Sequence, residues 1–362
     1  MSSVIGNNLK VTVFGESHGN SIGCVIDGLP AGITLDLARI SKDLDKRRGL
    51  KELSTTRREK DQFEIVSGYF NNKTTGTPLT FIIKNEDVDD KVYDDKKTVL
   101  RPGHADYTAY LKYDGFQDYR GGGHFSGRIT APIVIAGSIA SQILEKKGII
   151  IGSRIKEIHG VIDDSKIKDY KKTIEELNSL DFPVLDEKAS SEFKKEIENA
   201  RNALDSVGGV VETYALVNKY ALGEPLFDSV ESKLSHYIFS IGGVKGISFG
   251  LGFDFAKHFG SEVKDEFVVR GEEIVTTSNN NGGILGGITS LQPIVFDTVI
   301  KPTASIAQPQ KTVDIATLEE KTLEIKGRHD PCIVPKALFV INAMTALCLL
   351  DLLMEEYGRK NI

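Results

Sequence analysis

The chain has 362 residues, of which 45 are lysine or arginine and 51 are aspartate or glutamate, so its formal net charge is −6. Hydrophobic residues make up 40% and charged residues 27%, values of an ordinary globular protein that exclude a fibrous or disordered chain. The acidic balance argues against a general nucleic-acid partner. Glycine is enriched, with 35 residues against 11 prolines and no collagen-like period, so we expect the glycines to serve particular loops.

Cysteine usage and hydropathy indicate a cytoplasmic protein. Cys24, Cys332 and Cys348 form no CxxC motif, which argues against a disulfide framework and a structural zinc site, and we expect no bound metal. The first eight residues lack the basic and apolar regions of a signal peptide. Residues 337–354 are nearly all apolar, but Asn342 and Asp351 interrupt them and the stretch is short for a membrane span. We therefore predict a buried core helix there and no membrane partner.

Strands and helices alternate along the chain. Alternating or β-branched residues predict strands or extended segments over 10–14, 24–27, 62–70, 79–84, 149–162, 208–218 and 292–300. Helical spacing and stop signals predict helices over 36–48, 126–147, 165–180, 190–206, 227–241 and 335–357. No flexible linker divides the chain and the strands are not regularly separated by crossover helices. This pattern favours one α+β layered domain over residues 1–362 rather than a doubly wound fold.

The first motif of chemical interest is Gly15-Glu16-Ser17-His18-Gly19, which directly follows a predicted strand. Its glycines let the backbone approach a ligand closely, and a histidine there can act as an acid or base near neutral pH. The alternative is a turn whose polar side chains bond only the backbone. The segment satisfies G-x-S-x-G literally, but we do not interpret it as a nucleophile elbow because no triad order follows.

Two basic segments follow. Lys46-Arg47-Arg48, with Arg57-Arg58 shortly after, ends a predicted helix, where cations stabilise the helix dipole or form an anion site. Arg101-Pro102-Gly103-His104-Ala105-Asp106-Tyr107 is a turn that delivers His104 to the start of a helix. There His104 could either cap the helix or donate a proton to a departing phosphate.

Three further segments are rich in glycine or in charged residues. Residues 120–130, RGGGHFSGRIT, read as a backbone nest for an anion or cofactor and match neither common nucleotide-binding glycine motif. Residues 281–287, NGGILGG, precede 301–305, KPTAS. In 326–332, KGRHDPC, Asp330 stands before a proline and a long helix, so capping is the alternative to a chemical role.

These motifs, in this order, resemble the chorismate synthase family across most of the chain. The resemblance implies a lyase that eliminates phosphate from C3 and hydrogen from C6 of 5-enolpyruvylshikimate 3-phosphate to give chorismate. It implies a requirement for reduced FMN without net redox change, a β-α-β sandwich of one domain, and a homotetramer. The alternating elements accommodate that fold but do not by themselves yield it.

The resemblance also implies roles for individual residues. His18 matches the histidine near flavin N1, His104 the one that protonates the leaving phosphate, and Asp330 the aspartate near flavin N5 that relays the C6 proton. The cations expected to meet the anionic substrate, or the phosphate of NADP, are Arg47, Arg48 and Arg128. The positions expected to bind FMN are His124, Phe125, Ser126, Gly242, Gly243, Gly286, Lys301, Pro302, Thr303, Ala304, Ser305 and Arg328.

Some positions depart from the family pattern. His124 replaces an arginine, Ile129 an acidic residue, and Asn342 a common glutamate, while Gly49 follows the basic triplet where a proline is usual. These changes bear on phosphate contacts and FMN affinity rather than on the reaction. We hypothesise that protonated His124 partly replaces the arginine's charge.

Two other functions fit the motifs. One is an oxidoreductase that binds FMN and consumes NAD(P)H, and the other is an anion-binding module without catalysis. The sequence leaves open whether the chain reduces its own flavin with NADPH, although the absence of a separate nucleotide fold favours an external flavin reductant.

Overall fold

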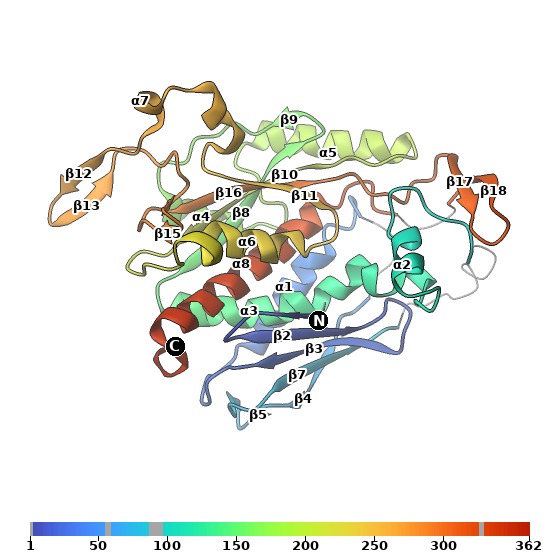
Figure 1. Ribbon diagram of the computed structural model, residues 1–362, viewed down its shortest axis with the longest axis horizontal. Coiled ribbons are helices and arrows are strands. Elements are labelled where there is room, and N and C mark those ends of the chain that lie inside the picture. Colours follow the sequence, from blue (N-terminus) through green and yellow to red (C-terminus); the bar gives the residue numbers. More distant parts are fainter. Residues whose placement is uncertain (1–2, 55–58, 87–96, 326–328) are drawn as a thin grey trace.

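The computed structural model describes residues 3–54, 59–86, 97–325 and 329–362. In this part of the chain, two five-stranded antiparallel sheets enclose a layer of helices (Figure 1). The layer contains α1 (Leu37–Arg48), α3 (Thr130–Lys146), α6 (Val230–Phe239) and α8 (Val334–Tyr357). The predicted α+β class and the β-α-β sandwich that the resemblance implies are both confirmed.

The first sheet has the strand order β1-β2-β3-β7-β4. Its strands are β1 (Val4–Ile5), β2 (Lys10–Gly15), β3 (Ser21–Asp27), β7 (Leu79–Lys84) and β4 (Phe63–Ser67). In β7, Leu79, Phe81 and Ile83 are fully buried while the residues between them are more exposed. This period of two places one face of the sheet on the helices.

The second sheet has the order β11-β16-β10-β8-β9. Its strands are β11 (Val244–Phe249), β16 (Ile294–Ile300), β10 (Gly209–Leu216), β8 (Ile150–Ile158) and β9 (Val161–Ile162). Its outer face is covered in part by α4 (Tyr170–Ser179) and α5 (Glu187–Asn202), so three layers of the sandwich gain a partial fourth (Figure 1).

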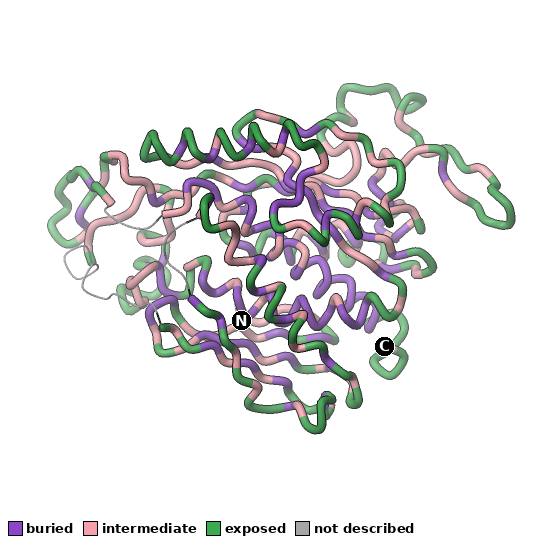
Figure 2. Tube along the Cα trace, turned by 180° about the vertical axis from the view of Figure 1, so that it is seen from behind, coloured by how far each residue is buried: buried purple, intermediate pink, exposed green. Residues whose placement is uncertain are grey.

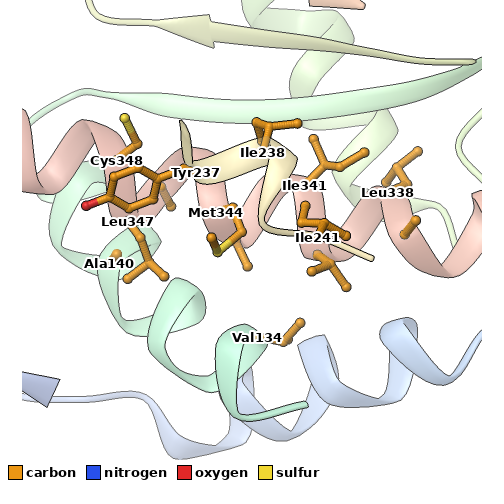
Figure 3. Packing of buried hydrophobic residues seen from close by; sticks show 14 of the residues in the cluster. Val134, Ala140, Tyr237, Ile238, Ile241, Leu338, Ile341, Met344, Leu347 and Cys348 are labelled. Atoms are coloured by element: carbon orange, nitrogen blue, oxygen red, sulfur yellow. The ribbon is translucent and has the colours of Figure 1, made fainter. Parts of the chain in front are cut away.

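Helices α3 and α8 form the centre of the core. A Cβ on Gly137 would lie 2.3 Å from the Cβ of Ala343, so the two helices approach closely at this pair. Figure 3 shows Leu338, Ile341, Met344 and Leu347 of α8 packed among side chains of α3 and α6. By length and composition both helices could cross a membrane, but 78% and 89% of their most apolar windows are buried inside the protein. Their hydrophobicity is that of core helices, as predicted for residues 337–354.

The remaining elements lie at the periphery. They are α2 (Asp106–Lys112), α7 (Gly260–Val263), and the hairpins β5–β6 (Tyr69–Phe70, Lys73–Thr74), β12–β13 (Phe267–Arg270, Glu273–Thr276), β14–β15 (Ile284–Leu285, Ile288–Thr289) and β17–β18 (Gln310–Asp314, Glu319–Leu323). Hairpin β12–β13 projects away from the body (Figure 1). Figure 2 shows burial concentrated in the two sheets and the helical layer, whereas the projecting hairpin is largely exposed.

Most predicted elements are present, with shifted ends. The helix predicted over 126–147 begins at Thr130, because Ser126 first caps a short 3-10 turn by accepting a hydrogen bond from the backbone of Arg128. The strand predicted over 62–70 is divided at Gly68 into β4 and β5. Strand β11 and the hairpins β12–β13 and β17–β18 were not predicted from the sequence.

Candidate active site

Three loops meet beside the N-terminus of α3: the turn of residues 16–20 between β2 and β3, the loop before α2, and the glycine turn Arg120–Phe125. The backbone amide of Ser17 donates to the carbonyl of Gly123 at 3.1 Å. His124 donates from Nδ1 to the carbonyl of Gly15 at 2.9 Å, and its Nε2 lies 3.3 Å from the hydroxyl of Ser3. His124 therefore ties the glycine turn to the end of β2.

The glycine turn holds two histidines side by side. Gly121, Gly122 and Gly123 all have positive φ, which other residues adopt only at a cost. A Cβ on Gly121 would lie 2.2 Å from both Cε1 and Nδ1 of His18, and one on Gly122 would lie 3.2 Å from Cε1 of His104. The rings of His18 and His104 thus rest against neighbouring glycines, so the structure brings these two predicted catalytic residues together.

His104 is held by an ion pair rather than serving as a helix cap. Its Nδ1 lies 2.8 Å from Oδ1 of Asp106, and Arg101 donates to the same carboxylate from Nε at 2.8 Å and from Nη2 at 2.6 Å. Burial opposes ionisation of Asp106, but the hydrogen bonds from Arg101 and His104 hold the pKa of its carboxyl well below the usual range. Ala105 occupies the N-cap of α2 without a side-chain bond, so the alternative interpretation of His104 as a capping residue is wrong.

Two predicted phosphate-binding arginines share one buried carboxylate. Arg47 Nη2 lies 3.2 Å from Oδ2 of Asp61, and Arg128 Nη1 pairs with Oδ1 of the same residue. The side chains of Arg47, Arg128 and Asp61 are 12%, 4% and 0% exposed. Arg128 also donates from Nε to Oδ1 of Asn85 at 3.1 Å, and Asn85 donates to the carbonyl of Gly19 at 2.7 Å. The cations are therefore linked to the turn that carries His18.

These arginines retain unused donors. Among the residues that the structure describes, Arg47 Nε and Arg128 Nη2 are buried without a hydrogen-bond acceptor. Burial lowers the pKa of Arg47, and the charges of Asp61 and Asp330 oppose that shift while the charge of Arg128 adds to it. Buried guanidinium groups with free N–H groups are typical of a site that receives an anionic ligand.

The loop of residues 301–305 joins the histidine loop to the second sheet. Lys301 donates from Nζ to the carbonyl of Gly103 at 2.6 Å, and its backbone amide donates to the carbonyl of Gly243 at 2.9 Å. Farther along the loop, the carbonyl of Thr303 accepts from the Ser206 hydroxyl at 2.8 Å. The Thr303 hydroxyl itself is buried and has no partner among the described residues.

Lys336 links Asp330 to the cationic end of α1. Both carboxylate oxygens of Asp330 accept from Lys336 Nζ, at 2.7 and 2.8 Å. Lys336 in turn packs against Gly49, where a Cβ would lie 3.1 Å from the lysine Cγ. The N-cap of α8 is Ile333, so the alternative interpretation of Asp330 as a helix cap is wrong.

Comparison with known proteins decides the family. The family model described as chorismate synthase matches residues 9–354. Curated chorismate synthases of Thermococcus gammatolerans and Pyrococcus abyssi are each 46% identical to this chain, covering 97% and 96% of it and 97% of each relative. A solved structure titled as the crystal structure of chorismate synthase has a TM-score of 0.75 at 29% identity, over 98% of this chain and 94% of that one.

The chain belongs to the chorismate synthase family. Membership makes it an enzyme of the lyase type that serves the shikimate pathway, as the sequence motifs indicated.

Not every predicted site residue lies with the histidines. Gly286 is in the turn of hairpin β14–β15, whose neighbouring glycine packs on Ser229 at the start of α6, and this hairpin is at the opposite end of the molecule from α2 (Figure 1). Arg48 donates to the carbonyl of Glu59 at 3.0 Å and pairs with Asp45. Lys46 points elsewhere and donates to the carbonyls of Asn178 and Leu180 at the end of α4. Arg328, Arg57 and Arg58 lie outside the described residues.

Four residues of the site were not predicted from the sequence: Asp61, Asn85, Asp106 and Lys336. Each contacts a predicted residue, as described above, and acts through it. Of these four, only Asp106 lies in a motif singled out from the sequence, two positions after His104 in residues 101–107. Only for Asp106, therefore, could the sequence have indicated a place in the site.

A cavity of about 520 Å³ lies outside this cluster, between α1, α3, α4, α8 and β8. Its lining includes Lys46, Asn342 and Phe339 but none of the predicted catalytic residues. We locate the chemistry at the histidines and buried arginines, because the described residues that line the cavity include no histidine and neither of the arginines with unused buried donors.

Proposed function

We propose that the protein is an FMN-dependent chorismate synthase, which removes phosphate from 5-enolpyruvylshikimate 3-phosphate by 1,4-elimination. The observation that carries the proposal is the placement of His18 and His104 on adjacent glycines of one turn. The buried arginines with free donors, linked to that turn through Asn85, support a phosphorylated dicarboxylate as substrate.

The residues of the site fit a flavin phosphate. Phe125 exposes 46% of its surface beside the glycine turn, and Thr303 offers a buried hydroxyl without a partner among the described residues. The residues that would hold FMN are Phe125, Ser126, Gly242, Gly243 and the loop Lys301, Pro302, Thr303, Ala304 and Ser305. When bound, reduced FMN supplies electron density to the carbon centre that loses phosphate, with no net redox change.

The protein's own groups perform the proton transfers and bind the charges. His104 donates a proton to the phosphate oxygen as the C3–O bond breaks and its electron pair leaves with the phosphate. The hydrogen at C6 departs as a proton, and Asp330 is the acceptor that Lys336 holds in place. His18, whose ring lies against Gly121, would support the cofactor. Arg47 and Arg128 stabilise the negative charge that grows on the leaving group.

The decisive experiment is anaerobic incubation of the purified protein with 5-enolpyruvylshikimate 3-phosphate and chemically reduced FMN. We expect chorismate to accumulate over many turnovers while the flavin stays reduced. Stoichiometric oxidation of the flavin would instead favour an FMN/NAD(P)H oxidoreductase. Substitution of His104 by Ala should lower the rate by about 10² or more, whereas an anion-binding module would be unaffected.

A second assay decides the source of electrons. We propose that an external flavin reductant supplies reduced FMN, and turnover with oxidised FMN and NADPH alone should therefore be negligible. Turnover under those conditions would show that the chain reduces its own flavin.

We also propose a cytoplasmic homotetramer. Burial of both apolar helices in the core supports the location. Large apolar side chains exposed on and near the projecting hairpin support self-association: Phe253 is 87% exposed, Phe267 66%, Val269 74% and Ile274 72%.

A further inference from the structure

Asp106 joins the side chains of Arg101 and His104 in the loop before α2. Its Oδ2 accepts from the backbone amide of Arg101 at 2.9 Å and from Arg101 Nε at 2.8 Å. Its Oδ1 accepts from Arg101 Nη2 at 2.6 Å and faces Nδ1 of His104 at 2.8 Å. We infer that Asp106 is a positioning residue that fixes the tautomer and orientation of His104.

The contacts determine where each ring nitrogen points. A carboxylate only accepts hydrogen bonds, so Nδ1 of His104 must carry the proton in this contact. The opposite edge of the ring, Cε1 and Nε2, then faces Gly122, where a Cβ would lie 3.2 and 3.4 Å from these two atoms. Nε2 is therefore the nitrogen directed at the glycine turn, on the side where His18 lies against Gly121.

This arrangement suits an acid. Before transfer, both nitrogens of the imidazolium carry protons, with Nδ1–H on Asp106 and Nε2–H directed at the turn. After Nε2 has given its proton to a phosphate oxygen, the ring is left as the neutral Nδ1–H form, which the carboxylate continues to stabilise. A second carboxylate in the chain offers a contrast: Asp118 binds Arg120 through Nε at 2.9 Å and Nη2 at 2.8 Å. Asp118 thus binds an arginine as Asp106 does, whereas Nδ1 of His104 lies on Asp106.

Substitution of Asp106 by Asn would move the proton of the neutral His104 ring from Nδ1 to Nε2. Arg101 directs two donors at the Oδ2 position, so the amide oxygen would occupy that position and the NH₂ group would take the place of Oδ1. The NH₂ group would then donate to Nδ1 of His104, leaving the proton of the neutral ring on Nε2. It would also oppose the imidazolium, because two donors would face each other.

The tautomer can be measured directly by ¹⁵N–¹H correlation spectra of protein labelled at its seven histidines, with the His104 signal assigned by loss in His104→Gln. At alkaline pH, wild-type His104 should be the Nδ1–H form. Asp106→Asn should change it to the Nε2–H form, and the control Asp118→Asn should leave it unchanged. A wild-type spectrum of the Nε2–H form would overturn the inference without any variant, as would an unchanged tautomer in Asp106→Asn.

The consequence for turnover rests on the proposed function. We expect kcat of Asp106→Asn to fall by about 10² or more, with a much smaller change in KM, because the substrate phosphate is bound by other residues. Equal kcat in the variant and the wild type would contradict the positioning role. If the spectra behave as expected but even the wild type forms no chorismate, the proposed reaction is wrong and the assignment of Asp106 stands.

Discussion

A methyl group at position 121 would occupy the place of the His18 ring. Its Cβ would lie 2.2 Å from two ring atoms, and the backbone there has φ of 58°. We therefore expect Gly121→Ala to displace His18 and to lower kcat by about 10², the scale of a 1 Å misplacement in an active site.

Gly127 provides a control for this substitution. It lies six residues later, and a Cβ there meets no atom within 4 Å. Gly127→Ala should keep both activity and thermal stability close to wild type. Steady-state kinetics of the two variants test whether the His18 ring must pack against a glycine. A wild-type kcat in Gly121→Ala would show that His18 needs no glycine beside it.

Removal of Asp61 would leave two buried guanidinium groups without their shared carboxylate. Breaking a buried ion pair from one side costs about 3–5 kcal/mol, so we expect Asp61→Ala to lower the free energy of unfolding in urea by that amount. Orthophosphate should restore part of the loss by supplying an anion to Arg47 and Arg128.

An exposed carboxylate is the reference for Asp61→Ala. Glu64 pairs with Lys84 at 3.2 Å, but both side chains are more than half exposed, and Glu64→Gln should cost at most about 1 kcal/mol. Equal effects of the two substitutions would mean that the Arg47–Asp61–Arg128 cluster is open to water.

The sequence predicted residues of this site unevenly. His18 and His104 stand beside glycines in short motifs, and the structure places their rings where those glycines allow close approach. Asp61 lies in no motif, and its importance comes from two arginines that are 14 and 67 positions away in the chain. Such a contact exists only after folding, so composition and spacing could not reveal it.

At the scale of elements, α8 carries one charged side chain deep in its apolar surface. Asp351 is 3% exposed and accepts hydrogen bonds from the backbone amides of Asn7, Asn8 and Leu9 and from the hydroxyl of Tyr237. The residue that interrupts the hydrophobic run thus anchors the segment between β1 and β2.

Asp351→Asn should therefore destabilise the fold. The amide has one accepting oxygen, so at least one buried donor would lose its acceptor, at about 1–3 kcal/mol. Amide hydrogen exchange should identify the donor that has lost its acceptor. The backbone amide of Asn7, Asn8 or Leu9 should exchange faster than in the wild type. Uniform acceleration across the sheet, without enhancement at these residues, would contradict this account.

Core elements were more predictable than peripheral ones. Helix α1 and strand β7 bury residues at regular intervals, and α8 is a nearly continuous apolar run, so the sequence predicted these elements within a few residues. Hairpin β12–β13 buries little, and Val269 and Ile274 are exposed there, so it lacks the alternation that marks a half-buried strand. Strand β11 was missed because glycine and mixed residues weaken its pattern.

At the scale of the whole molecule, we propose that the projecting hairpin takes part in self-association. An isolated two-stranded hairpin is at best marginally stable in water, so we expect β12–β13 to pack against another copy of the chain. The double substitution Phe267→Ser and Ile274→Ser should shift the proposed tetramer toward smaller species.

Sedimentation equilibrium would measure that change. A matched substitution of exposed Leu318 by Ser, in the turn of hairpin β17–β18, should leave the mass of the assembly unchanged. A tetramer that survives the double substitution would exclude the hairpin from the interface.

The bonds between Asp351 and residues 7–9 span 342 to 344 positions. A ribosome adds about 5–20 residues per second, so the first strands wait some tens of seconds for the helix that fastens them. Throughout that interval the nascent chain lacks α8, one of the two helices at the centre of the core. The first strands therefore gain the carboxylate that holds residues 7–9 only after every element between them and α8 has been synthesised.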